Sequence, residues 1–303
     1  MTAFVMPATS WWTAQKPTHN SPLGDGLSDR RAAVTRKPSS PWLIVFLLLA
    51  FGFTPVLKAQ APPRTIHVFV ALADNKNQGI VPVAAILGNG DDPQHNLYWG
   101  SAYGVKTFFS RSADWRLIAS SRGPRPEIPG PGILERCIFK HRAANVYLVA
   151  DAYQGNKIRQ AIVDFLEAAA GQEPESIPVK AGGQTLILKS RGAADLVAYA
   201  GHDGLMDFQL TTLPQGKNAN RQAIILACIS KSYFSAPLHA TGATPLLWTT
   251  GLMAPEAYTL KSAIDGWILR ESNDQIRERA AVAYDKYQRC GLRGARRLLV
   301  TGW

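Results

Sequence analysis

The stretches Asp195-Leu-Val-Ala-Tyr-Ala-Gly-His202 and Gln222-Ala-Ile-Ile-Leu-Ala-Cys228 decide the fold of this chain. Each is a short apolar run without polar alternation, which is typical of a strand buried on both faces of a sheet. Similar runs occupy residues 65–73, 145–150 and 245–250. Between them lie helical patterns, such as the amphipathic stretch 155–170. This alternation predicts an α/β fold, a three-layer α/β/α sandwich on a mostly parallel sheet.

Further elements are expected around these strands. They are a helix over 96–110, short strands over 115–120, 133–140 and 184–189, a helix over 255–270, and a last helix to about residue 288 that opens on the capping box Ser272-x-x-Gln275. We find no internal repeat and no linker within residues 62–303, so that region is predicted to be one domain.

The composition limits the class of protein. The chain has 303 residues, of which 46% are hydrophobic and 18% are charged. These values fit a packed globular chain and exclude a disordered chain, a collagen-like repeat and a polytopic membrane protein. The net charge is +11, yet no basic run interleaved with aromatic residues supports a nucleic-acid partner.

The N-terminal 61 residues look like a targeting segment. Residues 1–41 are rich in Ser, Thr, Pro and Gly and are predicted to be disordered. The apolar run 42–57 is shorter than the ~20 residues of a spanning helix. Basic residues precede this run and Ala59-Gln60-Ala61 follows it, which is the pattern of a signal peptide. We therefore predict an exported protein, periplasmic or secreted. The alternative is a retained N-terminal anchor, and either way this segment is the predicted contact with the membrane.

Three cysteines follow the apolar run, namely Cys137, Cys228 and Cys290. An odd number in an oxidising compartment leaves one thiol unpaired. A Cys137–Cys290 disulfide would leave Cys228 free, and the alternative is three separate buried thiols. No metal is expected, because the chain lacks Cys-x-x-Cys and His-rich spacing. No cofactor is expected either, because nucleotide-binding glycine motifs are absent.

A His and a Cys stand at the ends of two successive predicted strands. If these strands are neighbours in a parallel sheet, their ends lie ~5 Å apart. His202 can then withdraw a proton while the Cys228 sulfur attacks a carbonyl carbon. Gly204 allows close approach of a substrate and can present its backbone N–H to an oxyanion. The two strand ends therefore predict a shared site.

The stretches Tyr199-Ala-Gly-His-Asp-Gly204 and Leu226-Ala-Cys-Ile-Ser230 resemble the caspase-like cysteine peptidases, a clan that includes legumain, gingipain, clostripain and separase relatives. The resemblance implies a sandwich fold with His202 as the catalytic histidine and Cys228 as the nucleophile. It also implies an oxyanion site formed by backbone N–H groups of Cys228 and of the loop after His202. The expected function is that of an exported cysteine endopeptidase acting on peptides or proteins.

Asp203 departs from the family's pattern, which has His-Gly directly, and the interval between His202 and Cys228 is short. Asp203 either pairs with His202 or rotates the loop. The alternative function is therefore a non-catalytic envelope protein that binds a peptide or small ligand in the same crevice.

Acidic residues at the predicted strand ends raise the question of substrate preference. Asp74, Asp151 and Asp203 are candidates for a pocket that accepts a basic P1 side chain, since a buried carboxylate needs a cationic partner. Clostripain and gingipain prefer Arg or Lys at P1. The alternative for Asp74 and Asp151 is that they cap loops or helix starts.

Overall fold

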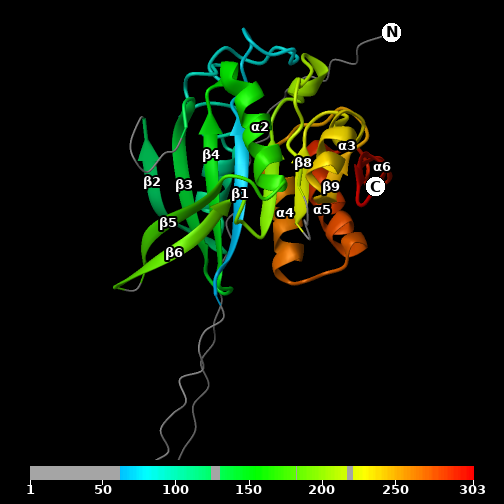
Figure 1. Ribbon diagram of the computed structural model, residues 1–303. Coiled ribbons are helices and arrows are strands. Elements are labelled where there is room, and N and C mark those ends of the chain that lie inside the picture. Colours follow the sequence, from blue (N-terminus) through cyan, green and yellow to red (C-terminus); the bar gives the residue numbers. More distant parts are fainter. Residues whose placement is uncertain (1–61, 124–129, 182, 217–220) are drawn as a thin grey trace, which may run out of the picture. The chain divides into compact units, whose positions relative to one another are not determined.

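Five parallel strands form the centre of the fold. A computed structural model describes residues 62–123, 130–181, 183–216 and 221–303. The parallel strands are β1 (Arg64–Ala71), β4 (Val146–Tyr153), β7 (Leu196–Ala200), β8 (Gln222–Leu226) and β9 (Thr244–Thr249). Antiparallel strands β2 (Trp115–Arg122) and β3 (Ile133–His141) extend one edge, and β10 (Leu299–Val300) ends the other. The strand order is β10-β9-β8-β7-β1-β4-β3-β2, which confirms the predicted α/β sandwich (Figure 1).

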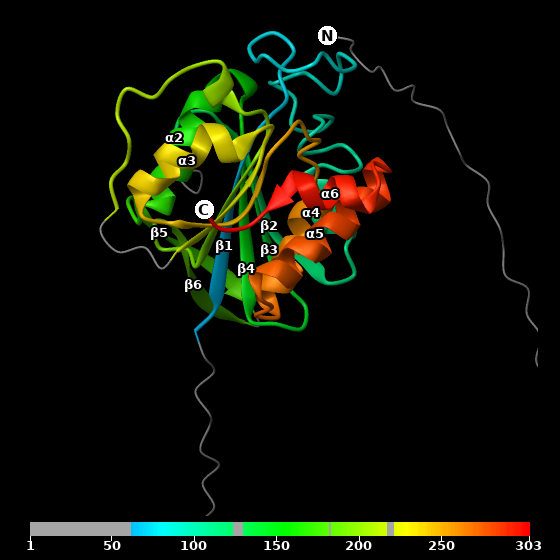
Figure 2. The ribbon, with the colours of Figure 1, turned by 90° about the vertical axis from the view of Figure 1, so that its right-hand side faces the viewer.

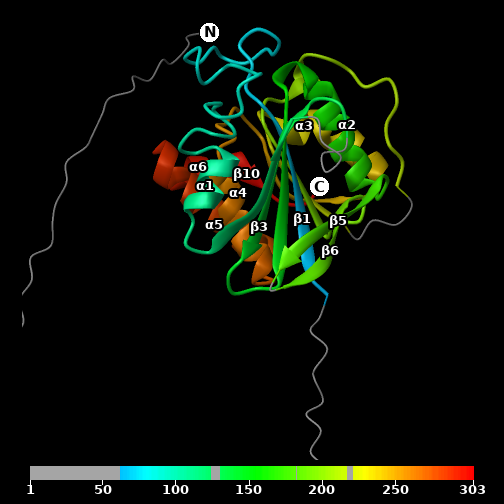
Figure 3. The same cartoon turned by 90° about the vertical axis from the view of Figure 1, so that its left-hand side faces the viewer.

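Helices cover both faces of this sheet (Figures 2 and 3). One face carries α1 (Val105–Arg111), α4 (Ala257–Ile268) and α5 (Asn273–Gln288), and α6 (Leu292–Leu298) leads from α5 to β10. The other face carries α2 (Ile158–Ala169), preceded by the 3₁₀ turn η1 (Gly155–Lys157), and α3 (Ser230–Thr241). The hairpin of β5 (Pro174–Ala181) and β6 (Gln184–Arg191) covers β3 and β4 on this second face. A second 3₁₀ turn, η2 (Gly204–Met206), follows β7.

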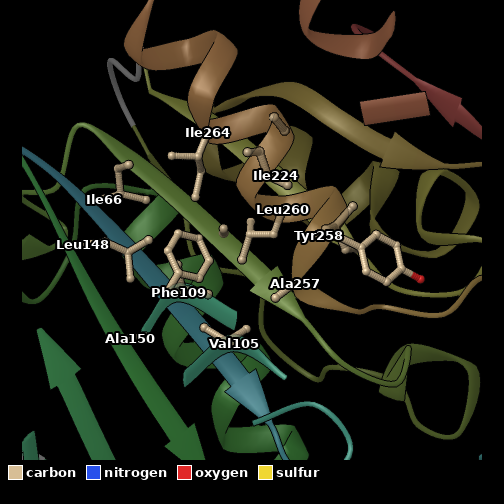
Figure 4. Close-up of a cluster of buried hydrophobic side chains, with 14 of the residues drawn as sticks. Ile66, Val105, Phe109, Leu148, Ala150, Ile224, Ala257, Tyr258, Leu260 and Ile264 are labelled. Carbon is tan, nitrogen blue, oxygen red and sulfur yellow. The ribbon is translucent and has the colours of Figure 1, made fainter. Parts of the chain in front are cut away.

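Strand β1 shows why the apolar runs are continuous. Ile66, Val68 and Val70 pack toward α1, α4 and α5, whereas Phe69 and Ala71 pack toward α2 and α3. Figure 4 shows the hydrophobic cluster on the α1, α4 and α5 side of the sheet, in which side chains of β1, β4 and β8 contact those of α1 and α4. A central strand between two helical layers buries both of its faces, so polar alternation is absent.

The predicted helix over 96–110 is too long. Residues 96–104 form turns, and α1 begins only at Val105. The Asn96 side chain accepts a hydrogen bond from Ala73 N (3.0 Å) and donates one to Ala73 O (2.8 Å). At Gly104 a Cβ atom would lie 2.4 Å from the backbone of Trp99. Residues 96–104 are thus held by hydrogen bonds to the chain just after β1, and they form turns where the first part of the helix was expected.

Strand β4 runs two residues beyond Asp151, so Asp151 lies inside the sheet rather than at a strand end. Its carboxylate accepts hydrogen bonds from Arg136 Nε (2.6 Å) and Nη2 (2.7 Å) and pairs with His67 Nε2 (2.9 Å). His67 Nδ1 faces Ser190 Oγ at 2.9 Å and accepts the Arg191 N–H at 3.0 Å. Burial alone would raise the pKa of Asp151, but the Arg136 guanidinium holds it well below its usual range.

The predicted Cys137–Cys290 disulfide is wrong, because the structure has three free cysteines. Cys137 is fully buried on β3, where its sulfur lies 3.7 Å from Ser120 Oγ. Cys290 is exposed just after α5. A side chain enclosed in the core and one open to solvent do not meet in this fold.

The predicted signal peptide and anchor, residues 1–61, lie outside the described residues. Among the helices that are described, none combines the length and the apolar character needed to cross a bilayer.

The buried pair of Arg136 and Asp151 makes a stability prediction. Asp151→Asn removes one of the two carboxylates that offset the enclosed Arg136 guanidinium, the other being Glu175 at 2.5 Å. The free energy of unfolding is expected to fall by about 3 kcal/mol. Urea unfolding at neutral pH measures it. The control is Asp274→Asn, whose side chain is 85% exposed and should change stability by under about 0.5 kcal/mol. Equal effects of both changes would contradict the role given to the buried pair.

Candidate active site

The register of two neighbouring strands brings His202 and Cys228 to the same level. Strands β7 and β8 pair in parallel with Ala200 opposite Leu226. His202 lies two residues after Ala200, and Cys228 lies two residues after Leu226. Ala198 and Leu226 pack on the α4–α5 face of the sheet. His202 and Cys228 each follow their strand after a bend in the chain at Gly201 and Ala227.

His202 and Cys228 line one cavity of about 380 Å³. Its walls come from the loops after β1, β7, β8 and β9, together with Gln288 at the end of α5. Strands β4 and β7 flank β1 on opposite sides, so the cavity lies beside the point where the strand order reverses. Crevices at the carboxyl ends of strands near such a point are where open α/β sheets bind ligands.

Asp207 orients the imidazole of His202. Its Oδ2 atom lies 2.7 Å from His202 Nε2 and also accepts the Gly79 N–H at 3.0 Å. With the Nε2 proton donated to this carboxylate, Nδ1 is the unprotonated nitrogen. Within the described chain Nδ1 has no hydrogen-bond partner. The imidazole therefore keeps its basic nitrogen for another group.

The loop that carries His202 is fixed at its backbone. The His202 carbonyl accepts hydrogen bonds from Tyr199 Oη (2.7 Å) and from the Gly204 N–H (3.1 Å). Gly201 has φ = +155°, and a Cβ atom there would lie 3.0 Å from the carbonyl oxygen of Ala71. Only glycine fits this position between β7 and the histidine.

Cys228 stands in the turn between β8 and α3. The residue after it, Ile229, has φ = +51°, a strained conformation for a β-branched side chain that costs on the order of 1–3 kcal/mol. The Cys228 sulfur accepts the Met253 N–H at 3.4 Å. Burial raises the pKa of the thiol, the Met253 hydrogen bond lowers it, and the charge of Asp203 raises it further. The resting group is therefore a thiol that needs a base, and in the described chain no hydrogen bond yet joins it to His202.

The backbone donors differ from those expected. Gly204 N–H is donated to the carbonyl of His202, so it is not available to an oxyanion in this conformation. In the chain as described, the N–H groups of Asp203 and Cys228 donate no hydrogen bond. Of the two donors expected at an oxyanion, Cys228 lines the cavity and Gly204 does not.

Asp203 caps the turn η2 rather than pairing with His202. Its Oδ1 atom accepts the Leu205 N–H at 3.0 Å, while Oδ2 is buried and without a partner among the described residues. The pKa of Asp203 is raised from 3.8 to about 7. Burial is the largest cause, the Leu205 hydrogen bond opposes it, and the nearby charge of Asp207 adds to it.

None of the three carboxylates expected in a substrate pocket, Asp74, Asp151 and Asp203, lines the cavity. Asp74 is buried and accepts the backbone N–H groups of Lys76 (2.9 Å) and Asn77 (3.2 Å), so it caps the loop after β1. Asp151 is enclosed with Arg136 and His67. The row Ser190–His67–Asp151 contains the residue types of a hydrolase triad, but all three are fully buried and a substrate has no access to them.

Two acidic residues near His202 and Cys228, Asp207 and Glu256, were not among the residues predicted from the sequence. Asp207 is five residues after His202, and no motif spacing marks it. Glu256 lines the cavity from the loop between β9 and α4. Its only sequence signal is its place after a predicted strand end, next to Pro255.

Searches of family models, of curated proteins and of solved structures returned no match to this chain. In the described part of the chain, no group of three or more His, Cys, Asp or Glu side chains is arranged to hold a metal ion.

The raised pKa of Asp203 predicts a pH-dependent contribution to stability. A carboxyl group with a higher pKa in the folded chain stabilises the fold fully below about pH 4, and this contribution is lost as the pH rises through about 7. Urea unfolding from pH 4 to pH 8 should therefore show a fall in stability that is smaller in Asp203→Asn. Parallel pH profiles of the two proteins would contradict the assignment.

Proposed function

We propose that this protein is a cysteine endopeptidase, a divergent relative of the caspase-like clan, with His202 and Cys228 as its catalytic pair. The observation that carries the proposal is their equal position beyond β7 and β8, on one wall of the same cavity. The mostly parallel sheet with helices on both faces is compatible with that clan. The predicted signal peptide adds the proposal that the enzyme acts after export.

The proposed reaction starts from a thiol held by Met253, whose carbonyl oxygen accepts the S–H at 3.5 Å and whose N–H is donated to the sulfur at 3.4 Å. The S–H turns from Met253 to His202 Nδ1, which has no partner among the described residues. His202 Nδ1 takes the proton, and the Cys228 sulfur attacks the carbonyl carbon of the peptide bond.

The N–H group of Cys228, which lines the cavity and has no acceptor among the described residues, donates to the oxyanion that forms. His202 then gives its proton to the leaving amine as the C–N bond breaks, which leaves a thioester. Water, activated by His202, hydrolyses this thioester to a carboxylate and restores the thiol.

A peptide is the proposed substrate because the mouth of the cavity is apolar and open. Val81 and Leu252 line it with exposed fractions of 83% and 71%. Exposed aliphatic side chains beside a cavity offer contacts to the residues that flank a scissile bond.

The alternative is a non-catalytic protein that binds a ligand in the same cavity. The raised pKa of the Cys228 thiol and its lack of a hydrogen bond to His202 favour this function. It predicts ligand binding without cleavage.

The first test replaces the nucleophile. Cys228→Ala should lower cleavage of a fluorogenic peptide library at least about 1,000-fold, because the thioester cannot form. Cys290→Ala is the matched control, since that thiol is exposed and does not line the cavity, and it should cleave at the rate of the unmodified protein. Full cleavage by Cys228→Ala would refute the proposal, and the absence of cleavage in every form would favour the binding protein.

The second test concerns Asp207, a positioning residue that acts through His202. Asp207→Asn can donate to Nε2 and so stabilise the wrong imidazole tautomer, which should lower kcat by roughly 10²- to 10⁴-fold. The KM should stay within about threefold, because Asp207 does not line the cavity. Asp274→Asn serves as the control for a surface carboxylate. An unchanged kcat in Asp207→Asn would show that the hydrogen bond to His202 does not serve catalysis.

A further inference from the structure

The oxyanion of the proposed reaction has one backbone donor on the cavity wall where two are expected. The N–H group of Cys228 has no acceptor among the described residues, whereas the Gly204 N–H is donated to the His202 carbonyl at 3.1 Å. Sites of acyl transfer stabilise an oxyanion with several donors, which are backbone N–H groups or side chains such as Tyr and Asn. The second donor in this protein therefore has to be a side chain that lines the cavity.

Besides the reacting pair, two side chains with an N–H or O–H donor stand in the described part of the lining, namely Tyr98 and Gln288. The Gln288 amide is committed, because its Nε2 atom donates to Glu256 Oε2 (3.2 Å) and to Tyr258 Oη (2.6 Å). Glu256 is the acceptor of this group. The Tyr98 hydroxyl makes no hydrogen bond with the described residues. It is therefore the uncommitted side-chain donor that this lining supplies.

The ring of Tyr98 is buried, yet its hydroxyl oxygen is open. Only 6% of the residue is exposed, and it belongs to the hydrophobic cluster on the α1, α4 and α5 side of the sheet. The oxygen is not among the enclosed atoms that lack a partner, so it borders free space, and the cavity is the space that Tyr98 lines. A hydroxyl at the end of a closely packed ring has a fixed position, which a donor to a transition state needs.

The backbone of Tyr98 is held as well. Its N–H donates to Asn96 Oδ1 (3.1 Å), and its carbonyl accepts the Val105 N–H (2.9 Å). The Asn96 side chain in turn hydrogen-bonds to Ala73, just after β1. The turns over residues 96–104, which stand where a helix was expected, thus bring Tyr98 to the cavity that the reacting pair also lines.

Electrostatics relate the hydroxyl to the reacting thiol. Burial raises the pKa of Tyr98 most, and the charges of Cys228 and Glu256 raise it further. The phenol therefore keeps its proton at neutral pH and remains a donor. The effect of Cys228 also means that the hydroxyl lies close enough to the sulfur for charge at that centre to act on it. A hydroxyl in that position can stabilise the negative charge that develops on the attacked carbonyl oxygen.

We propose that Tyr98 is a catalytic residue whose hydroxyl donates a hydrogen bond to the oxyanion, beside the N–H group of Cys228. This inference deepens the proposed function and rests on it. As the sulfur attacks, the π electrons of the carbonyl move to its oxygen, and both donors bind that oxygen. Tyr98 keeps its proton throughout, because the returning electron pair expels the amine and His202 supplies the proton of the amine. A phenol thus takes the place that the resemblance gives to a backbone N–H of the loop after His202.

The test is Tyr98→Phe, which keeps the ring and removes the donor. Loss of one oxyanion donor should lower kcat by roughly 10²- to 10³-fold, while the KM stays within about threefold, because the donor acts in the transition state. Alkylation of Cys228 by iodoacetamide displaces iodide without forming an oxyanion, so its rate should stay within about twofold. Tyr103→Phe is the matched control, since Tyr103 is 43% exposed and does not line the cavity, and it should cleave at the rate of the unmodified protein.

A readout without turnover is the binding of a library of peptide aldehydes, compared with that of the corresponding peptide alcohols. The Cys228 thiol adds across the C=O bond of an aldehyde, so that the sulfur bonds to carbon and the proton goes to the oxygen, which takes the place of the oxyanion. Tyr98→Phe should weaken aldehyde binding by at least about tenfold. It should leave the binding of the alcohols unchanged, because they form no bond to the sulfur.

The outcomes separate this inference from the function on which it rests. Cleavage that requires Cys228 but proceeds at the full rate in Tyr98→Phe refutes this inference alone. An equal loss of cleavage and of alkylation in Tyr98→Phe also overturns it, because the hydroxyl then serves only the shape of the cavity. Weaker aldehyde binding by Tyr98→Phe in a protein that cleaves no peptide upholds the donor and refutes the peptidase. A protein that neither cleaves peptides nor binds aldehydes refutes both.

Discussion

The parallel register of β7 against β8 is the constraint on which the site depends. Ala200 pairs with Leu226, and this pairing sets His202 and Cys228 at equal distances beyond the sheet. A slip of one residue would move one strand's side chains to the opposite face. The register is firmly specified because both faces of these strands are buried, against α4 and α5 on one side and α2 and α3 on the other.

The polar groups of this fold fall into two kinds. One kind forms a closed buried network, as Asp151 does with Arg136 and His67 beneath the β5–β6 hairpin. The other kind lies at the carboxyl edge of the sheet, where His202 Nδ1 and Glu256 Oε1 have no hydrogen-bond partner among the described residues. His67 and His202 each lie within hydrogen-bond distance of an aspartate, but their surroundings differ. The site at His67 is closed and structural, whereas the site at His202 borders a cavity.

Burial acts on both the thiol and the carboxylate that line the cavity. It raises the pKa of Cys228, so the reactivity of the thiol in the proposed enzyme depends on a base that Asp207 holds in one tautomer. It also raises the pKa of Glu256. In the proposed enzyme, a bound substrate would exclude water from the thiol and the imidazole, which strengthens the interactions among them.

Local patterns in the sequence were enough to predict the parallel strands of the sheet, the helix expected over 155–170, the last helix that ends at about 288, and the position of His202 and Cys228 after two successive strands. Continuous apolar runs and capping residues are local signals, and two equal strand ends need only a parallel pairing. Which side chains contact one another in space could be read only from the folded chain. Asp151 became a core ion pair because β4 runs on to Tyr153. Cys137 and Cys290 do not form a disulfide. Residues 96–104 form turns rather than a helix, and the Asn96 side chain hydrogen-bonds to the chain just after β1. Asp207 and Glu256 reached the site through loops, whose paths depend on contacts distant in sequence and leave no periodic pattern.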